Sequence, residues 1–368
     1  MRNESFLICK NDFINIVYDA CSLCYKSTRE RTLKEKLEYI ENKIKLGHES
    51  VIEHSNLIIM LILDKNDISI HKDLIEVMAA SRHINYNIKN DDSSVYVLMG
   101  GSIRAYKNIF RNIKNGNNMV LNLIKNRLYE TCKEFYYDFI QSGILNHRSF
   151  MDSEFIRIKS NGQKSNKYYD IVNMDSINLI LDGVNFITND QDLFEIDDIL
   201  DMVTVTVYFK RVSRITSQQI TRHRNAISQK SQRYVDEGEG EFIHPLSSNI
   251  EYFIDKYNID NKTYCSNALE RYRYMRDNGV KKEDARYYLP QNINTELYVT
   301  FTLRNLIHFI NLRTDIAAQA EIRNLATLLE KDVKEEYTML DKDISVYLLP
   351  KYILSENNYK VENAFITT

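Results

Sequence analysis

The stretch DMVTVTVYFKRVSRITSQQITRHR, residues 201–224, gives the clearest indication of the fold of this chain. Val and Thr alternate over 201–209, which predicts a half-buried β-strand. Over 211–224, Val212, Ile215 and Ile220 recur at helical spacing, so we expect a helix to follow the strand. The arginines of 222–224 then lie near the end of that helix.

Similar patterns elsewhere predict further strands and helices. NLIIMLIL, residues 56–63, is a continuous aliphatic run of the kind found in buried strands. Apolar residues recur at helical spacing in the ranges 27–45, 117–139, 193–200, 295–312 and 317–340. No internal repeat is visible in the sequence. This mixture of strands and long helices predicts a fold of the α/β (α+β) class.

The composition is typical of a globular protein, with 43% hydrophobic and 27% charged residues. No run of about 18 apolar residues occurs, and the first residues do not resemble a secretory signal, so we expect a cytoplasmic protein without a membrane span. The net charge of −3 gives no general attraction to nucleic acid. Cys21 and Cys24 form a CxxC pair without a second pair or nearby histidines, which favours reduced cysteines on a helix over half a zinc site.

The basic residues after the predicted strand could form an anion site. Arg222 and Arg224 lie two positions apart, so on a helix they would point to different sides and reach different ligands. Gln229, Ser231 and Arg233 alternate, and in an extended segment they would present hydrogen-bond donors on one side. The alternative interpretation is a solvated basic helix end.

Other candidate residues have ordinary explanations beside the functional ones. Arg286 and Arg313 stand in mostly apolar surroundings and need polar partners, which Glu283 and Asp315 could supply as ion pairs. Glu321 and Arg323 could be a surface pair on a helix. His48 and His54 lack the spacing of a metal-binding helix, so a helix start is the better interpretation of that segment. Gly100 and Gly101 are interpreted as a turn.

Six segments, in order, resemble the motifs of the flavin-dependent thymidylate synthase family. They are GHESVIEH (47–54), QQITRHR (218–224), SQKSQRYV (228–235), ARYYLP (285–290), LRNLIHFINLR (303–313) and AQAEIR (318–323). The signature of that family, RHR followed by a short spacer and SxRY, matches Arg222, His223, Arg224, Ser231, Arg233 and Tyr234. The resemblance covers roughly residues 30–54 and 200–340. It implies one catalytic domain over 1–368, with a central mixed or antiparallel sheet, long helices and a mostly helical insertion at about 65–200.

The resemblance also implies roles for individual residues. The positions that match flavin contacts are His48, Ser50, Arg222, His223, Arg224, Gln229, Thr302, Arg304 and His308. The positions that match dUMP contacts are Gln219, Arg222, Gln229, Ser231, Arg233, Arg286 and Arg313. Arg313 matches the arginine that faces the uracil ring, and it is therefore the expected catalytic residue.

The implied reaction is reductive methylation of dUMP to dTMP. Methylenetetrahydrofolate would donate the carbon, and FAD reduced by NADPH would carry the hydride. None of the five cysteines lies between Pro and His, so the covalent activation used by the other thymidylate synthase family has no candidate here. The resemblance further implies a homotetramer with active sites shared between subunits, with no need for a membrane or for nucleic acid.

Two departures from the family pattern keep alternatives open. Six residues separate Arg224 from Ser231, fewer than is usual in the family, and Thr302 and His308 stand where asparagines are usual. One alternative is a flavin- and folate-dependent hydroxymethylation of dUMP or a related pyrimidine deoxynucleotide. A second alternative is a non-catalytic paralogue that binds a nucleotide or RNA.

Overall fold

A computed structural model describes residues 3–27, 29–113, 116–131, 164–243, 256 and 261–340. Within these residues the fold combines helices with two antiparallel sheets of four strands each, which confirms the α/β (α+β) class. The expected single central sheet is instead divided into two sheets, because residues 65–200 contribute strands as well as helices. No helix in these ranges is long and apolar enough to cross a membrane.

The first sheet has the strand order β1-β2-β4-β3. Its strands are β1 (Glu4–Lys10), β2 (Leu57–Asp64), β3 (Asn85–Asn90) and β4 (Ser94–Gly101). The predicted strand at 56–63 is confirmed as β2. Residues 57–61 are fully buried because both faces of this strand are covered. Ile58 and Met60 face one hydrophobic core, and Leu57 and Ile59 face a second.

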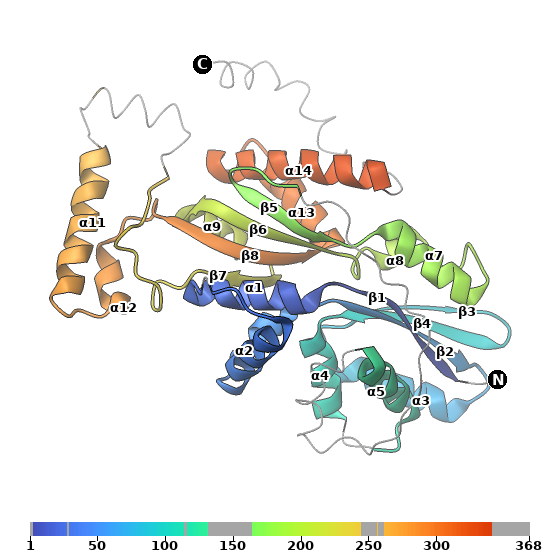
Figure 1. Ribbon diagram of the computed structural model, residues 1–368. Helices are drawn as coiled ribbons and strands as arrows, with labels where there is room; N and C mark the ends of the chain where they lie inside the picture. The colour runs from blue at the N-terminus through green and yellow to red at the C-terminus, as the bar shows by residue number, and fades with distance from the viewer. Residues whose placement is uncertain are drawn as a thin grey trace.

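Six helices belong to this part of the chain. They are α1 (Phe13–Tyr25), α2 (Leu33–Lys45), the 3-10 helix η1 (Glu49–His54), α3 (Ile68–Ala80), α4 (Ile103–Asn112) and α5 (Met119–Thr131). α2 begins where Thr32 and Glu35 form a capping box. α5 confirms the first part of the helix predicted at 117–139, and the part after 131 lies outside the described residues. α3, α4 and α5 lie on one side of the first sheet (Figure 1).

The second sheet has the order β5-β6-β8-β7. Its strands are β5 (Tyr169–Met174), β6 (Thr204–Ser213), β7 (Ala226–Gln229) and β8 (Asn294–Thr302). The valines of β6 join the core, as predicted, and the threonine side is also buried. Thr206 is fully buried, and its hydroxyl lies 2.8 Å from that of Thr300. This second face is polar because it lies against η1 rather than an apolar layer.

The helices of the second part frame this sheet. They are α7 (Ile177–Thr188), α8 (Ile196–Ile199), α9 (Arg214–Ile220), α11 (Asn261–Asp277), α12 (Lys282–Ala285), the 3-10 helix η3 (Arg286–Tyr288), α13 (Leu303–Arg313) and α14 (Ala320–Leu340). α13 and α14 cover the outer face of the second sheet, whereas α1 lies along its other face (Figure 1). α11 and α12 project from one end of the molecule.

The helix predicted over 295–312 is wrong in its first half. Asn294–Thr302 is strand β8, and α13 begins only at Leu303. The segment TELYVTFT is rich in β-branched and aromatic residues that favour strands, and its apolar positions fit both periods. Thr302 separates the two elements, because its hydroxyl accepts a hydrogen bond from the backbone N of Asn305 and so caps α13.

The Gly100–Gly101 pair is not a turn, as had been expected, but the last two residues of β4. A Cβ atom on Gly100 would lie 2.8 Å from Met202, and one on Gly101 would lie 2.7 Å from Ile84. These glycines therefore allow the end of the first sheet to approach its neighbours closely.

Candidate functional site

The residues of 222–224 follow helix α9 rather than continuing it. α9 ends at Ile220, and the backbone N of His223 donates to the carbonyl of Ile220 at 3.1 Å. The side chains of Arg222 and Arg224 are exposed. Among the residues that the structure describes, no carboxylate lies within 4 Å of either guanidinium group. The two arginines are thus available to an anionic ligand.

Arg313, the last residue of α13, reaches this turn. Its Nε lies 3.2 Å from Nε2 of His223, and its Nη2 lies 3.5 Å from the carbonyl oxygen of Gln219. Burial, and then the charge of Arg222, lower the pKa of Arg313. The ion pair with Asp315 that offered an ordinary explanation does not form. We call Gln219, Arg222, His223, Arg224 and Arg313 the α13 group.

His223 is held in the neutral form. Burial lowers its pKa to about 4, and the nearby charge of Arg313 and the ring of His308 act in the same direction. A neutral imidazole can accept a hydrogen bond at Nε2 from the guanidinium of Arg313. The ring of His308 lies edge-on to that of His223, with 5.9 Å between their centroids. The geometry therefore fixes the direction of the Arg313 side chain.

Two other residues of the expected flavin set have structural contacts. The hydroxyl of Thr302 caps α13, and Nε of Arg304 pairs with Asp201 at 2.9 Å. Both contacts hold the start of α13 in place. The exposed His308, one turn further along, remains available to a ligand.

A second group of predicted residues lies beyond the other end of β7. The strand ends at Gln229, and a turn follows in which the backbone N of Val235 donates to the carbonyl of Ser231 at 2.8 Å. The expected extended conformation over 229–233 is therefore wrong after Gln229. Arg233 is exposed, with its Nε 3.6 Å from a carboxylate oxygen of Glu283. We call Ser231, Arg233, Tyr234, Arg286 and His48 the β7-turn group.

Aromatic contacts connect this turn to the N-terminal helices. The ring of Tyr234 stacks on that of Tyr25 at 5.1 Å, and Tyr25 meets His48 edge-on at 6.0 Å. The ammonium of Lys43 lies 3.4 Å from the centre of the Tyr25 ring. The structure thus brings His48 near Tyr234, although the two residues are far apart in the sequence. Ser50 is exposed at the start of η1.

Around this turn lie Arg286, which was predicted, and two basic residues that no motif marks, Arg214 and Lys282. Arg286 donates from Nε to the backbone carbonyl of Glu283 at 3.1 Å and makes no ion pair with its carboxylate. Burial lowers the pKa of Arg214, whereas Glu237 opposes the shift and Arg286 reinforces it. Lys282 donates to the carbonyl of Tyr234 at 3.0 Å. Arg214 stands in RVSRITS with no motif to mark it, so only the fold reveals that it lies near Arg286.

Gln229 lies between the two groups, but its side chain points into the protein and not toward a ligand. Its Nε2 lies 2.9 Å from Oγ of Ser217 and 3.3 Å from Oγ1 of Thr295. β7 has four residues, so the strand is roughly 13 Å long. The α13 group and the β7-turn group lie at its two ends. One chain therefore holds the predicted ligand contacts as two separate groups.

His54 is a structural residue of the site that the sequence analysis did not single out as a ligand. It is fully buried, with Nδ1 3.0 Å from Oγ1 of Thr300 and Nε2 3.0 Å from Oγ of Ser228. Burial lowers its pKa to about 3. This ring attaches η1 to β7 and β8 at the polar face of the second sheet. Among the described residues, no group of His, Cys, Asp and Glu could hold a metal ion.

Helix α4 braces η1 from the other side. Glu49 pairs with Arg111 at 2.7 Å and with Lys107 at 3.1 Å, and Glu53 pairs with Arg104. The hydrogen bond from Arg111 is the main cause that lowers the pKa of Glu49 to about 2. The segment that carries His48 and Ser50 is thus fixed between the two halves of the chain.

Glu321 and Arg323 do not form the surface pair that was considered. Glu321 accepts hydrogen bonds from the backbone N and the hydroxyl of Ser213, at 2.8 and 2.6 Å. Arg323 donates to the carbonyl of Ile316 at 2.6 Å. Glu321 therefore ties α14 to the start of α9. The Cys21 and Cys24 thiols of α1 are free, as the interpretation of a reduced pair requires.

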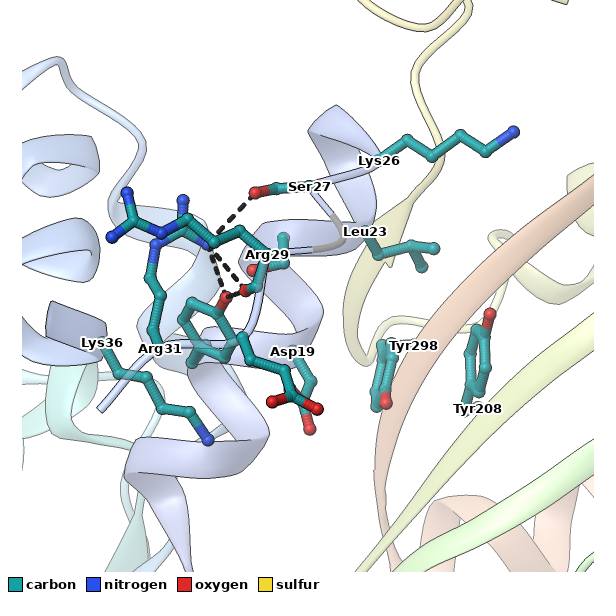
Figure 2. A pocket seen from close by; sticks show the side chains of 12 residues that line it. Asp19, Leu23, Lys26, Ser27, Arg29, Arg31, Lys36, Tyr208 and Tyr298 are labelled. Carbon is teal, nitrogen blue, oxygen red and sulfur yellow. Dashed lines mark hydrogen bonds between the residues drawn. The ribbon is translucent and has the colours of Figure 1, made fainter. Parts of the chain in front are cut away.

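A cavity of about 580 Å³ lies between α1, the chain that follows it and the second sheet (Figure 2). Tyr208 and Tyr298 form one wall and stack at 4.7 Å. The charged residues that line it are Asp19, Lys26, Arg29, Glu30, Arg31 and Lys36. None of the predicted site residues lines this cavity, so it is distinct from the two arginine groups.

Comparisons with known proteins support the resemblance. Residues 188–337 match the family described as "Thymidylate synthase complementing protein". The chain is 34% identical over 173 residues to a flavin-dependent thymidylate synthase of Saccharolobus solfataricus, covering 46% of this chain and 63% of that protein. The corresponding protein of Pyrococcus furiosus is 35% identical over 144 residues, with coverage of 38% and 59%. That of Geobacter sulfurreducens is 37% identical over 140 residues, with coverage of 37% and 59%. The chain thus spans about three fifths of the length of these relatives.

Proposed function

We propose that this chain, whose residues 188–337 belong to the thymidylate synthase complementing protein family, catalyses the reductive methylation of dUMP to dTMP. FAD reduced by NADPH would carry the hydride, and methylenetetrahydrofolate would donate the carbon. The relatives named above are flavin-dependent thymidylate synthases. A cytoplasmic location, expected from the sequence, is part of the proposal.

The observation that carries the proposal is the concentration of arginines without carboxylate partners in the α13 group. Arg222 lies close enough to Arg313 to lower its pKa, and Arg224 stands two positions along the chain from Arg222. Like charges gathered in this way repel one another, and an anion between them removes the repulsion. A nucleotide phosphate and the pyrophosphate of a dinucleotide are both suitable ligands. The donor set therefore fits dUMP and FAD.

Arg313 would act on the uracil ring. C5 of uracil is a poor nucleophile, and a guanidinium directed at the ring would stabilise negative charge that develops when N3 loses its proton. His223 accepts from Nε of Arg313, and the Gln219 carbonyl lies near Nη2, so the remaining donors face outward. His223 thus acts as a positioning residue. When bound, the reduced flavin supplies the hydride that completes the methyl group.

The cysteines fit a reaction without a covalent protein nucleophile. Burial raises the pKa of Cys21 to about 12 and also raises that of Cys24. Burial raises the pKa of Cys9 as well. Thiols with such raised pKa values are poor nucleophiles at neutral pH. Electrostatic activation by Arg313 is therefore the mechanism that the described residues favour.

The flavin would lie against exposed members of the predicted set. His48, Ser50, Arg224 and His308 have side chains that are at least partly accessible. Thr302 and Arg304 would contribute indirectly, by holding α13. We propose that Ser231, Arg233 and Arg286 bind the phosphate of dUMP together with Arg222. Because these residues lie at both ends of β7, the proposal requires active sites shared between subunits, as in the homotetramer that the resemblance implies.

The test is the product formed from dUMP, methylenetetrahydrofolate, NADPH and FAD. Mass spectrometry should detect dTMP, and tritium should be released from [5-3H]dUMP. A product with one additional oxygen would instead indicate hydroxymethylation. A purified protein that shows no flavin absorbance and forms no product would support the non-catalytic alternative.

A further inference from the structure

The two sheets have the same topology. In each, the spatial order of the strands along the chain is first, second, fourth, third, and every neighbouring pair is antiparallel. Among the described residues, the first strand of each half is followed by helices, and the second strand is followed by one helix, which is α3 in the first half and α9 in the second. The fourth strand is followed by two described helices, α4 and α5 in the first half and α13 and α14 in the second. This agreement extends over both described parts of the chain (Figure 1).

The pairing registers also agree. Leu57 of β2 pairs with Gly101, the residue just before Ser102, the cap of α4. In the second sheet, Val205 of β6 pairs with Phe301, likewise the residue just before the cap of α13, Thr302. The first strand of each sheet carries an irregularity near its end, between Leu7 and Cys9 in β1 and between Ile171 and Asn173 in β5. β-Bulges are specific features, so their recurrence at matching places supports a common origin.

Short sequences at equivalent places are alike. DFINIVYD (12–19) at the start of α1 matches DSINLILD (175–182) at the start of α7 at four of eight positions. SRHIN (81–85), just before or at the start of β3, matches TRHRN (221–225) just before β7 at three of five positions. The second match falls on the arginine-rich motif itself.

Each half of the chain places a short helix on the sheet of the other half, and the two contacts are equivalent. η1, which precedes β2, places His54 on Ser228 of β7 and Thr300 of β8. Reciprocally, α8, which precedes β6, lies on β3. Nδ2 of Asn87 donates to the carbonyl of Asp198 at 3.2 Å, and Lys89 pairs with the Asp198 carboxylate at 3.1 Å. Figure 1 shows α1 along the second sheet and α7 with α8 along the first. This reciprocity is that of an approximate twofold axis.

We infer that the chain is a fused pair of copies of one fold, that the first copy has lost its nucleotide site, and that two chains form an assembly with two sites. The first copy comprises β1 to α5, and the second comprises β5 to α14. The part of the inference that concerns the sites rests on the proposed function.

The first copy lacks the residues that the α13 group needs. The counterpart of Arg224 in the matched motif is Ile84, which is 5% exposed and packs toward Gly101. Arg313 is the eleventh residue after the cap of α13, Thr302. The eleventh residue after the cap of α4, Ser102, is Ile113, which is 6% exposed. Both guanidinium groups have thus been replaced by core isoleucines.

The first copy also lacks counterparts of Ser231, Arg233 and Arg286. In the second copy, residues 230–293 separate β7 from β8 and carry Ser231, Arg233 and Arg286. In the first copy, the three residues 91–93 join β3 to β4 in a turn. The carboxylate of Asp91 accepts from the backbone N of Ser93 and of Ser94, both at 2.7 Å. An acidic turn of this length cannot bind a phosphate. Each chain therefore carries one set of site residues.

A second copy of this chain can complete that set. The α13 group and the β7-turn group lie at opposite ends of β7, so a twofold axis can bring the α13 group of each chain to the β7-turn group of its partner. Exposed apolar residues accompany both groups: Leu312 lies in the last turn of α13 and Ile316 follows it, and Tyr234, Tyr287 and Tyr288 lie at or near the turn after β7. Exposed apolar residues of this kind mark protein interfaces. Two chains would then supply four copies of the fold, which is the number in the homotetramer that the resemblance implies.

The first test is the mass and the stoichiometry of the purified protein. Each chain has a mass of 43.4 kDa, so light scattering should give about 87 kDa for two chains. Titration calorimetry with dUMP on the flavin-loaded protein should give one site per chain. A monomer, a mass of about 174 kDa, or two dUMP sites per chain would overturn the inference. The mass does not depend on activity, so a dimer that makes no dTMP would refute the proposed function and leave the assembly intact.

The second test is complementation between inactive variants. Arg222→Ala removes a residue of the α13 group, and Arg233→Ala removes one of the β7-turn group. Both side chains are exposed, so folding should be retained. Each variant alone should be inactive. After unfolding and refolding together, half of the dimers contain both variants and have one intact site, so about one quarter of the wild-type activity should return. No recovery, with mixed dimers present, would overturn the shared site.

The matched control lies in the first copy. Arg82 is the counterpart of Arg222 and is also exposed. Arg82→Ala should leave dUMP binding, flavin absorbance and turnover unchanged, whereas Arg222→Ala should abolish dUMP binding. If Arg82→Ala lowered the number of dUMP molecules bound per chain, the first copy would have a working site and the inference would be wrong.

Discussion

The Nε atom of Arg313 lies 3.2 Å from Nε2 of His223, at the junction of α13 with the turn after α9. Both residues have lowered pKa values, mainly because of burial. A neutral imidazole is thus the acceptor for a permanently charged donor. This contact joins the arginine expected to act on the substrate to the arginine-rich motif, and the first prediction follows from it.

Arg313→Ala should reduce kcat at least 100-fold, because the charge directed at the substrate ring is lost. The absorbance of bound flavin should persist, since Arg313 is not a predicted flavin contact. Turnover of dUMP and the visible spectrum of the same sample provide the measurement. A colourless Arg313→Ala protein would assign the residue to the flavin site instead.

His223 can be tested with a pair of substitutions that differ in one property. His223→Asn retains an acceptor for Nε of Arg313, whereas His223→Leu has a similar size and none. We expect His223→Leu to lower kcat about 10- to 100-fold and His223→Asn to recover much of that loss. Equal activity in the two variants would show that the acceptor does not position Arg313.

His54 should make stability dependent on pH. Its pKa falls from the ordinary 6.5 to about 3 in the folded protein, so the unfolded chain binds the proton more readily. Its contribution to stability is complete above pH 6.5 and declines as the pH falls toward 3, by about 1.4 kcal/mol per pH unit. The temperature of unfolding, measured from pH 8 to pH 4, should therefore decrease.

His54→Gln supplies the comparison for that measurement, because glutamine does not titrate. The variant should be less stable at pH 7, and its unfolding temperature should decrease less between pH 6.5 and pH 4. Parallel pH profiles for the two proteins would contradict a titrating role for His54.

Gly100→Ala should destabilise the fold by about 1–3 kcal/mol, since the new methyl group would lie 2.8 Å from Met202. Gly116→Ala is the matched control, because a Cβ atom there meets nothing within 4 Å. Denaturant titrations of both variants measure the difference. Equal stabilities would mean that the Met202 side chain moves aside without cost.

Helix α4 should influence the site from outside it. Glu49→Gln removes the charge that pairs with Lys107 and Arg111 and should loosen η1, which carries Ser50 and follows His48. We expect weaker retention of flavin and an unchanged KM for dUMP, because Glu49, Ser50 and His48 are not predicted dUMP contacts. An altered KM with normal flavin content would contradict this role.

Local patterns in the sequence were sufficient for one strand of each sheet and for several helices. β6 and α9 follow directly from the valine alternation and the helical spacing that precede Arg222, and the aliphatic run at 56–63 is β2. The approach of Arg313 to His223 could not be derived in this way, because it depends on the packing of α13 against the turn. The resemblance alone suggested that these residues belong to one site.

Other features were missed for identifiable physical reasons. The pattern predicts a helix for β8 because its apolar positions fit the helical period as well as the strand period of two residues. Only the pairing with β6 and β7 decides between helix and strand. The duplication was not visible because similarity remains in two short segments, at 12–19 and 81–85, while the pairing registers preserve the rest. The burial of His54 depends on Ser228 and Thr300, which no local pattern connects to it.

The hydrogen bond between His54 and Thr300 spans 246 positions of the chain. At a synthesis rate of about 5–20 residues per second, the ribosome needs roughly 10–50 s to make the partner of this histidine after the histidine itself. During that interval His54 lacks Thr300 as a partner, whereas the apolar residues of α1 already have neighbours in the core of the first half of the chain. The attachment of η1 to the second sheet therefore follows the synthesis of β8 and is one of the later steps in the folding of the chain.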